Sequence, residues 1–261
     1  MAHVPTDTPP GVPATKVAEF GASLLLSEEH HLCPGCGHPV AWRLLCEVMT
    51  ELSLADRAVG VIGHGCYTQA AVLTDLEWLQ CLHGRAPAVA TGVKRVHPDV
   101  AVFTLQGDGD MASEGLHELL HAAGRAEPIT CIMLNNGVFG DTGGQMTATT
   151  VVGQRTKTSL EGRDPASHGF PIPVADLVRT LPGTAYVARG AVNNAGSVAQ
   201  TKKFLRRALE LQMEGAGFTF VEILTMCPTG WFIPTAEGPG YVASIFEETF
   251  PVGQLKTAAR G

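Results

Sequence analysis

The chain has 261 residues, and its 25 acidic against 18 basic side chains give it a formal net charge of −7 at neutral pH. This surplus of negative charge argues against non-specific binding to nucleic acid, which requires a basic surface. With 45% hydrophobic residues, the chain can bury a sizeable core as one α/β domain or two small ones. The longest early apolar run, residues 22–26, is too short for a signal peptide or a membrane span. We therefore expect a cytoplasmic protein that binds neither nucleic acid nor membrane.

The hydrophobic pattern predicts alternating helices and strands behind a flexible start. Residues 1–16 are rich in Pro and Thr, and we expect a flexible N-terminal arm there and a single domain over 17–261. Apolar residues at helical spacing predict helices over 40–52, 87–94, 116–125, 174–181 and 197–213. Continuous apolar runs predict buried strands at 59–62, 100–105, 129–134, 184–188 and 219–224. This alternation indicates an α/β fold with a doubly wound, mostly parallel sheet and helices on both faces. The polar stretch 147–171 has the character of a functional loop.

The most informative motif is Cys-Pro-Gly-Cys-Gly-His at residues 33–38. Two thiols separated by two residues can hold one metal ion or two irons of one cluster. Cys66 and Cys227 lie in similar turns flanked by Gly or Pro, so four thiolates from three loops fit a Cys₄ iron–sulfur or zinc site. The chain has seven cysteines, an odd number, and several of them are clustered in turns rather than evenly spaced; in an apparently unexported chain this pattern favours metal ligation over disulfides. Cys46 and Cys131 fall in a helical stripe and a buried strand, and we expect them in the core.

Two polar turns follow neighbouring predicted strands: a Gly-Asp-Gly turn after the first and an Asn-Asn-Gly turn after the second. A strand–helix–strand crossover of this length places both carboxyl ends at the edge where open α/β sheets bind ligands. Asp108 and Asn136 would then offer two oxygens to one Mg²⁺, with the backbone carbonyl of Val138 as a third. Gly109 would leave room for a diphosphate beside the following helix N-terminus. The pair of turns predicts a site for Mg²⁺ and a diphosphate.

In their joint order, these motifs resemble the thiamine-diphosphate-binding β subunits of the 2-oxoacid:ferredoxin oxidoreductases. The resemblance runs from about Cys33 to Trp231, through Cys-Pro-Gly-Cys-Gly, Gly-x-Gly-Cys, His-Gly-Arg-Ala, Gly-Asp-Gly-Asp, Asn-Asn-Gly-Val-Phe-Gly, Thr-Gly-Gly-Gln and Cys-Pro-Thr-Gly-Trp. It implies that the ligands of a [4Fe–4S] cluster are Cys33, Cys36, Cys66 and Cys227. It also implies that the Mg²⁺ ligands are Asp108, Asn136 and the carbonyl of Val138.

The resemblance further implies contacts to thiamine diphosphate from four short segments. They map to His64, Gly65, Cys66, Tyr67, Cys81, Leu82, His83, Gly84, Gly109, Asp110, Gly140 and Asp141. No catalytic residue is assigned in this chain, because the family takes the glutamate that activates the aminopyrimidine from a partner α polypeptide. Two positions depart from the family pattern: Tyr67 replaces a small hydroxyl residue and Asp141 replaces an apolar one.

The activity that the resemblance implies is the CoA-dependent oxidative decarboxylation of a 2-oxoacid to acyl-CoA and CO₂. Single electrons would pass through the cluster to ferredoxin. The chain would act in a hetero-oligomer with an α-type subunit. The stretches 92–95, 144–146 and 162–165 look most like the branched-chain (2-oxoisovalerate) members. 2-Oxoglutarate is the next candidate, and pyruvate or an aryl-glyoxylate stays open.

Two other protein classes also stay open. One is a non-redox thiamine-diphosphate decarboxylase or synthase subunit with a structural Cys₄ zinc site, and the other is a non-catalytic, zinc-stabilised interaction module. His117 and His121 have zinc spacing on a predicted helix, but no third ligand is evident and we expect structural histidines. Arg85 is expected to contact either the cofactor or a local carboxylate.

Overall fold

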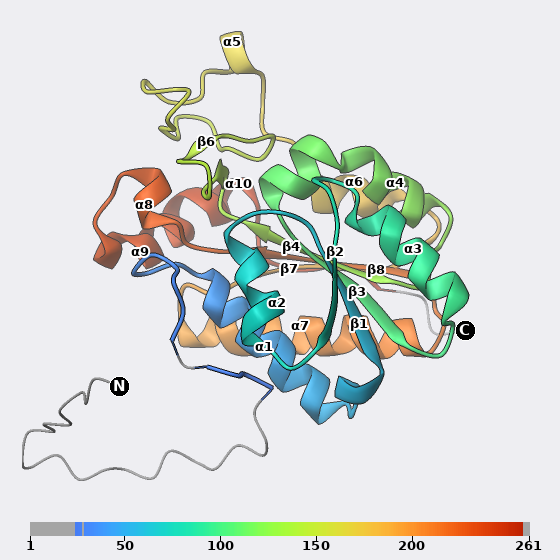
Figure 1. The fold of residues 1–261 in the computed structure, drawn as a ribbon. Helices are drawn as coiled ribbons and strands as arrows, with labels where there is room; N and C mark the ends of the chain where they lie inside the picture. The colour runs from blue at the N-terminus through green and yellow to red at the C-terminus, as the bar shows by residue number, and fades with distance from the viewer. Residues whose placement is uncertain (1–23, 28, 258–261) are drawn as a thin grey trace, which may run out of the picture.

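The computed structural model describes residues 24–27 and 29–257, so the arm predicted over 1–16 lies outside the described residues. A seven-stranded sheet in the order β2-β1-β3-β4-β8-β7-β9 forms the centre of the molecule (Figure 1). Its strands are β1 (Ala58–Ile62), β2 (Glu77–Gln80), β3 (Ala101–Gly107), β4 (Thr130–Asn135), β7 (Thr184–Ala191), β8 (Phe218–Leu224) and β9 (Gly253–Thr257). Neighbouring strands are parallel except for β7 and β9, which confirms the mostly parallel sheet.

Helices cover both faces of the sheet, as a doubly wound fold requires. The longer ones are α1 (His38–Glu51), α3 (Ala86–Val96), α4 (Leu116–Gly124), α6 (Val174–Thr180) and α7 (Ala195–Met213). Helices α1 and α7 pack on one face, and α3, α4 and α6 pack on the other (Figure 1). Every predicted helix and strand is present, with ends that differ by a few residues. No helix in residues 24–257, residue 28 aside, combines the length and apolarity needed to cross a membrane.

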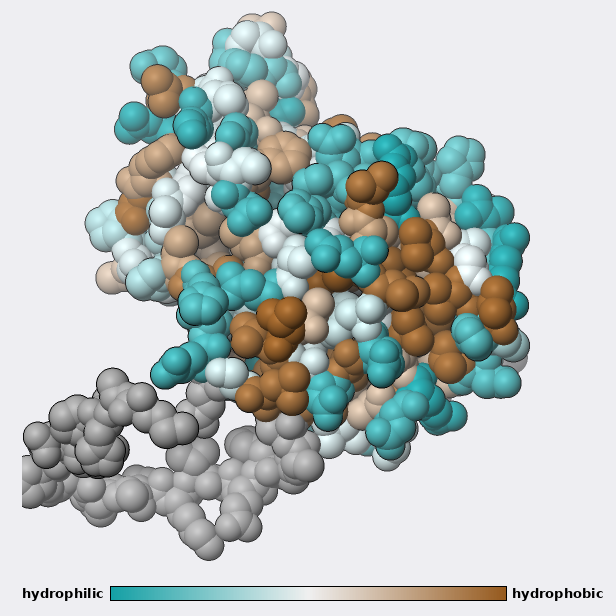
Figure 2. All heavy atoms as spheres, viewed as in Figure 1, coloured by the Kyte–Doolittle hydropathy of each residue, from teal (hydrophilic) through white to brown (hydrophobic). Residues whose placement is uncertain are grey.

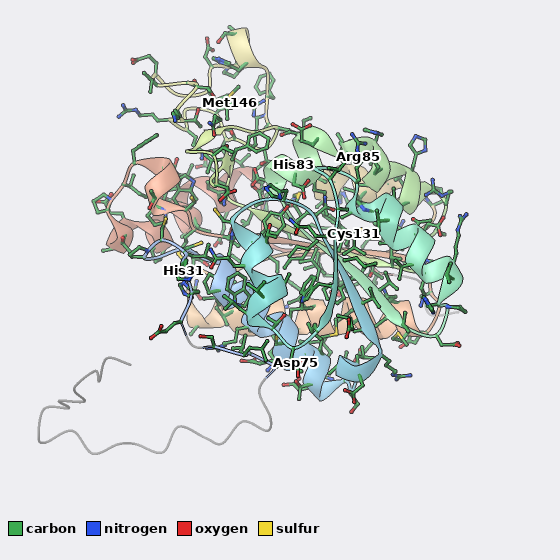
Figure 3. All side chains as sticks on the ribbon, in the orientation of Figure 1. His31, Asp75, His83, Arg85, Cys131 and Met146 are labelled. Atoms are coloured by element: carbon green, nitrogen blue, oxygen red, sulfur yellow. The ribbon has the colours of Figure 1, made fainter. Side chains whose placement is uncertain are left out.

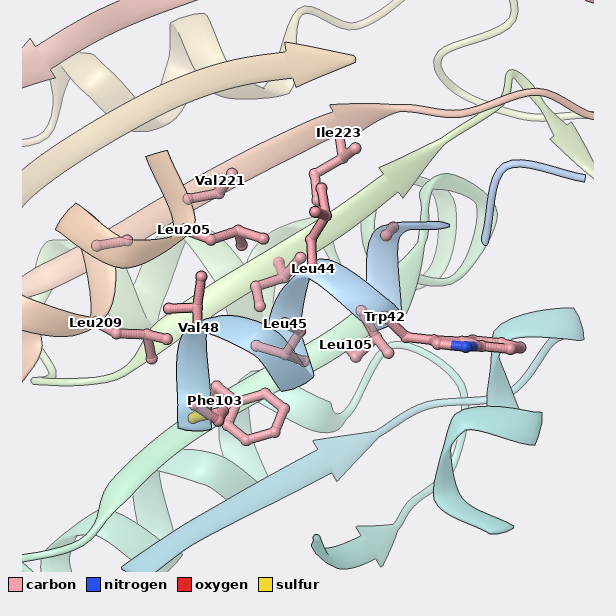
Figure 4. Packing of buried hydrophobic residues seen from close by; sticks show 14 of the residues in the cluster. Trp42, Leu44, Leu45, Val48, Phe103, Leu105, Leu205, Leu209, Val221 and Ile223 are labelled. Carbon is pink, nitrogen blue, oxygen red and sulfur yellow. The ribbon is translucent and has the colours of Figure 1, made fainter. Parts of the chain in front are cut away.

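Alternating side chains of the strands divide the hydrophobic core into two layers. On β3, Phe103 and Leu105 pack against α1 and α7, whereas Val102 packs on the opposite layer. Figure 4 shows the first layer, in which Trp42, Leu44, Leu45 and Val48 of α1 meet Leu205, Leu209, Phe103, Leu105, Val221 and Ile223. Cys46 and Cys131 are buried, as predicted, and Figure 3 places Cys131 within the sheet.

The sequence pattern did not predict the two edge strands or several short helical turns. Strands β2 and β9 are short and largely exposed, so neither has the continuous apolar run that marks the central strands. The unpredicted turns are α2 (Ala70–Leu73), α5 (Pro165–His168), α8 (Pro228–Trp231), α9 (Gly238–Tyr241) and α10 (Glu247–Thr249). Each has four residues or fewer, which is too short for a periodic signal. Beside edge strand β2, apolar side chains of α3 form a brown area in Figure 2 and line an open groove.

The polar stretch 147–171 contains α5 and otherwise little regular structure. Arg163 is buried within it and ties its backbone together. Its guanidinium donates to the carbonyls of Thr150 at 2.7 Å, Gly169 at 2.9 Å and Phe170 at 2.8 Å. One side chain therefore holds both ends of this loop.

A buried ion pair connects the sheet interior to the turn after β4. Arg189 on β7 and Glu222 on β8 are both fully buried, and Arg189 Nε lies 2.7 Å from Glu222 Oε2. The other carboxylate oxygen of Glu222 accepts from Asn135 Nδ2 at 2.7 Å, and Asn135 Oδ1 accepts from the Gly137 amide at 3.1 Å. Glu222 therefore braces the Asn-Asn-Gly turn through Asn135.

We expect Glu222→Ala to lower the free energy of unfolding by about 3–5 kcal/mol, because it leaves a buried guanidinium without its closest carboxylate. Urea denaturation of the full chain measures this change. Glu161→Ala is the matched control, since Glu161 is exposed and its loss should change stability by no more than about 0.5 kcal/mol. Equal midpoints for the two variants would show that the ion pair does not stabilise the fold.

Candidate functional site

A cleft opens at the carboxyl ends of β1, β3 and β4, beside the point where the strand order reverses between β1 and β3. It contains about 550 Å³ of free space, part of it open to solvent. Its walls come from the loops after these strands and from the start of α1. The lining residues are His38, His64, Gly65, Cys66, Tyr67, His83, Gly107, Asp108, Gly109, Asp110, Asn136, Val138, Phe139, Gly140, Asp141 and Thr142.

Asp108 and Asn136 lie side by side, as the predicted crossover requires. Strands β3 and β4 are parallel, with Gly107 opposite Leu134, and the Asn136 amide donates to Asp108 Oδ1 at 3.3 Å. The Thr147 and Thr149 hydroxyls each donate to Asp108 Oδ2 at 2.6 Å.

These bonds hold a carboxylate that is almost fully buried. Burial raises the pKa of Asp108 to about 6, although the two threonine hydroxyls act in the opposite direction. A cation beside it would favour its ionised form. A buried carboxylate next to a carboxamide oxygen is a donor set that fits Mg²⁺.

Asn136 is held at three atoms. Its Oδ1 accepts from the Val138 amide at 3.1 Å, and its Nδ2 lies 3.3 Å from His38 Nε2. Its backbone carbonyl accepts from Trp231 Nε1 at 2.7 Å. Burial lowers the pKa of His38 to about 4, so its imidazole is neutral at physiological pH.

Asp110 is the centre of a second buried network, which joins three loops. It accepts hydrogen bonds from the Tyr67 hydroxyl, the Gly84 amide and Gln106 Nε2, and His83 Nδ1 lies 3.2 Å away. Burial, followed by the charge of Asp110, raises the pKa of Tyr67 well above its usual range. The Asp110 side chain therefore fixes the walls of the cleft.

The ring of Phe139 packs against Gly109. It fills the position where a Cβ at this residue would lie, so a larger residue would not fit here. In addition, β3 continues into a wide π-helical turn, η3 (Gly109–Glu114), before α4 begins. Such turns expose backbone groups and occur often at functional sites. The diphosphate site at Gly109, beside this turn, stays a prediction.

The four candidate cluster cysteines come together at one end of the cleft. Cys66 and Cys227 both place their sulfur beside Gly140, where an added Cβ would lie 3.7 and 3.4 Å from them. Burial raises the pKa of Cys36 to about 12, and the charges of Cys227, Cys66 and Cys33 add to the effect. All four thiols are free, and Cys33 is the exposed member.

The described residues do not form a site ready for one metal ion. Within the described part of the chain, no three Cys, His, Asp or Glu side chains are close enough to hold a single metal ion. A tetrahedral zinc site needs every sulfur about 2.3 Å from one point.

Asp141 lies beside Cys66, with its Oδ1 3.7 Å from the sulfur. Burial raises the pKa of Cys66 to about 12, and the Asp141 charge is the next cause. The departure from the family pattern at this position therefore puts a negative charge at the junction of cleft and thiols.

Three of the predicted cofactor contacts do not line the cleft. The Cys81 thiol donates to the Ile62 carbonyl at 3.5 Å, Leu82 is 81% exposed, and Gly84 contributes its amide to Asp110. Arg85 forms an ion pair with Glu118, so it contacts a local carboxylate (Figure 3). His117 lies 2.9 Å from the same carboxylate.

The sequence reasoning missed several residues that shape the site. They are His38, Phe139, Thr142, Thr147 and Thr149. The position of His38 directly after the Cys-Pro-Gly-Cys-Gly motif could have indicated that it lies at the site. Nothing in the sequence indicated that Thr147 and Thr149 contact Asp108, because that contact depends on the path of a long loop.

Comparisons with known proteins agree with this geometry. The family described as "Thiamine pyrophosphate enzyme, C-terminal TPP binding domain" matches residues 63–223. A 2-oxoglutarate:ferredoxin oxidoreductase from Magnetococcus marinus, solved with 2-oxoglutarate, coenzyme A and succinyl-CoA bound, superposes with a TM-score of 0.74 at 26% identity. That superposition covers 91% of this chain and 84% of the other.

Proteins that are similar in sequence are also named as subunits of enzymes that act on 2-oxoacids. A ketoisovalerate oxidoreductase subunit, VorA, from Methanothermobacter thermautotrophicus is 39% identical over 87% of this chain, which spans about half (47%) of that relative's length. A 2-oxoglutarate synthase subunit, KorB, from Archaeoglobus fulgidus is 33% identical over 78% of this chain and 72% of its own length. The resemblance seen in the sequence motifs is confirmed. This chain belongs to the thiamine pyrophosphate enzymes and, among them, to the 2-oxoacid:ferredoxin oxidoreductase subunits.

Proposed function

We propose that this chain is the cofactor-binding β-type subunit of an enzyme that oxidatively decarboxylates a 2-oxoacid to acyl-CoA and CO₂. In this proposal it binds thiamine diphosphate through Mg²⁺, holds a [4Fe–4S] cluster that passes single electrons to ferredoxin, and acts with an α-type partner. The observation that carries the proposal is the pairing of Asp108 with Asn136 in a cleft whose end carries four cysteines.

The residues of this chain would bind and orient the cofactor, and bound thiamine diphosphate would supply the decarboxylation chemistry. Asp108 and Asn136 would hold Mg²⁺, with the Val138 carbonyl as the third protein ligand. Hydrogen bonds from Thr147 and Thr149 keep the Asp108 carboxylate in one orientation. The network around Asp110 keeps the opposite wall fixed.

We favour an iron–sulfur cluster over zinc as the group that the four thiols hold. The thiols lie near one end of the cleft, and the relatives in sequence and in structure are named as oxidoreductases. A cluster of four irons bridges thiolates that are farther apart than a single zinc allows. This supports the redox function over both zinc-based alternatives.

A branched-chain substrate is proposed from the relatives. The VorA subunit is named for ketoisovalerate and is more similar to this chain than the KorB subunits, which are named for 2-oxoglutarate. None of the three sequence stretches that suggested this substrate, 92–95, 144–146 and 162–165, is among the residues that line the cleft; the first lies on α3. There Lys94 donates to the carbonyls of Pro98 and Val100, so it has a structural role.

We expect Cys227→Ser to lose most of the iron and sulfide from anaerobically purified protein, because a serine hydroxyl is a poor substitute for a thiolate ligand. Metal and sulfide analysis measures this loss. Cys131→Ser is the matched control, since Cys131 is buried in the sheet and should leave the iron content unchanged. A full complement of iron in Cys227→Ser, or zinc in place of iron in the wild type, would contradict the cluster assignment.

Asp108→Ala removes the only charged ligand assigned to Mg²⁺. The affinity for thiamine diphosphate in the presence of Mg²⁺ should fall by at least about tenfold, since even outer partners of metal ligands have effects of that size. Calorimetric titration of the purified protein measures the change. Asp56→Ala, at an exposed residue far along the chain from both turns, should bind as the wild type does. Equal binding by Asp108→Ala would mean that the metal site is elsewhere.

The isolated chain should not reduce a viologen dye with any 2-oxoacid and CoA, because no assigned residue supplies the carboxylate that activates the aminopyrimidine. An α-type partner should restore the reaction, with 2-oxoisovalerate a better substrate than 2-oxoglutarate. Anaerobic dye reduction with and without the partner measures both. CoA-dependent reduction by the single chain would show that it carries the activating group itself.

A further inference from the structure

His38 links the candidate cluster loop to a candidate metal ligand. It follows Cys-Pro-Gly-Cys-Gly directly and begins α1, yet its side chain points into the cleft floor, where Nε2 lies 3.3 Å from Asn136 Nδ2. His38 is 3% exposed and Asn136 is 4% exposed. Neither side chain can exchange its hydrogen bonds for water without a cost, so the pairing between them is energetically important.

The contacts of Asn136 determine which end of its carboxamide is oxygen. An amide N–H can only donate, so the atom that lies 3.1 Å from the Val138 amide must be Oδ1. The other end is then the NH₂ group, which donates to His38 Nε2. Because an NH₂ group can only donate, His38 Nε2 must be the acceptor, and the imidazole proton then lies on Nδ1.

This orientation matters for a cation. A carboxamide oxygen can be a metal ligand, whereas an NH₂ group offers only hydrogens to a positive ion. If the NH₂ group lost its acceptor, the carboxamide would carry a buried unpaired donor and would turn more easily. We propose that His38 is a positioning residue, which accepts from Asn136 Nδ2 and so keeps Asn136 Oδ1 directed at the cation site.

The position of His38 is set in turn by the cysteine-bearing segments. The Gly37 amide donates to the Met226 carbonyl at 2.9 Å, which ties the start of α1 to the residue before Cys227. Gly37 must be a glycine for this approach, because an added Cβ would lie 2.7 Å from the Met226 nitrogen. Through His38 and Gly37, the metal ligand is therefore held by the loops that carry the candidate cluster ligands.

The inference rests on the proposed Mg²⁺ site, and three variants of His38 test it in the complex purified anaerobically with its partner subunit. In His38→Gln, the Gln Oε1 is as many bonds from Cβ as His38 Nε2 and can accept the same hydrogen bond. In His38→Asn the carbonyl is one bond shorter, and in His38→Leu there is no acceptor. The measurement is the Mg²⁺ concentration that gives half-maximal binding of thiamine diphosphate, with iron content and thermal midpoint measured beside it.

We expect His38→Leu and His38→Asn to need about tenfold more Mg²⁺ or higher, the effect typical of losing a partner that orients a metal ligand. His38→Gln should bind close to the wild type, and all three variants should keep their iron. Wild-type affinity in His38→Leu would overturn the inference alone. Equal weakening in all three variants, with loss of iron, would also overturn it, because a structural role would then explain the result. A wild-type complex that binds no thiamine diphosphate with Mg²⁺ would overturn the proposed function as well.

Discussion

The parallel pairing of β3 with β4 is the constraint on which both the core and the site depend. Its register sets Gly107 opposite Leu134, so the next residues along each strand, with Asp108 and Asn136 among them, emerge together at one edge of the sheet. The same register directs Phe103 and Leu105 into the layer under α1. A slip of one residue would turn those side chains to the other face. Burial of the core therefore holds the two polar turns in place.

Burying so many polar groups beside the sheet requires partners for each of them. Asp108 has two threonine hydroxyls and a backbone amide, Asp110 has donors from two loops and from β3, and Glu222 has Arg189 and Asn135. Each carboxylate joins segments that are far apart in the sequence. Satisfied networks of this kind make the surrounding loops rigid, which is what a site that must orient a cofactor needs.

Features that depend on neighbouring residues could be predicted from the sequence, whereas features that depend on contacts between distant segments could not. Continuous apolar runs predict the central strands. Because the strands joined by a crossover helix lie side by side and parallel, Asp108 and Asn136 were expected to meet at one edge of the sheet. The Phe139 ring beside Gly109 could not be predicted, since it depends on how the turn after β4 folds back over η3. Asp110 was expected as a cofactor contact, but its buried partners Tyr67 and Gly84 come from other loops. Edge strands β2 and β9 lack a periodic signal because one or both of their faces meet solvent.

The four cysteines form a path from the cleft to the surface. Cys66 lines the cleft and Cys33 is exposed, while Cys36, Cys66 and Cys227 are all half-buried. Under the proposed function, a cluster held by them would meet the cofactor on one side and solvent on the other. Asp141 stands at the inner side of this path, 3.7 Å from the Cys66 sulfur. A fixed negative charge there disfavours the addition of an electron to a neighbouring group, so it would make a reduced cluster a stronger donor. The departure at residue 141 would then lower the reduction potential of a cluster held by these cysteines.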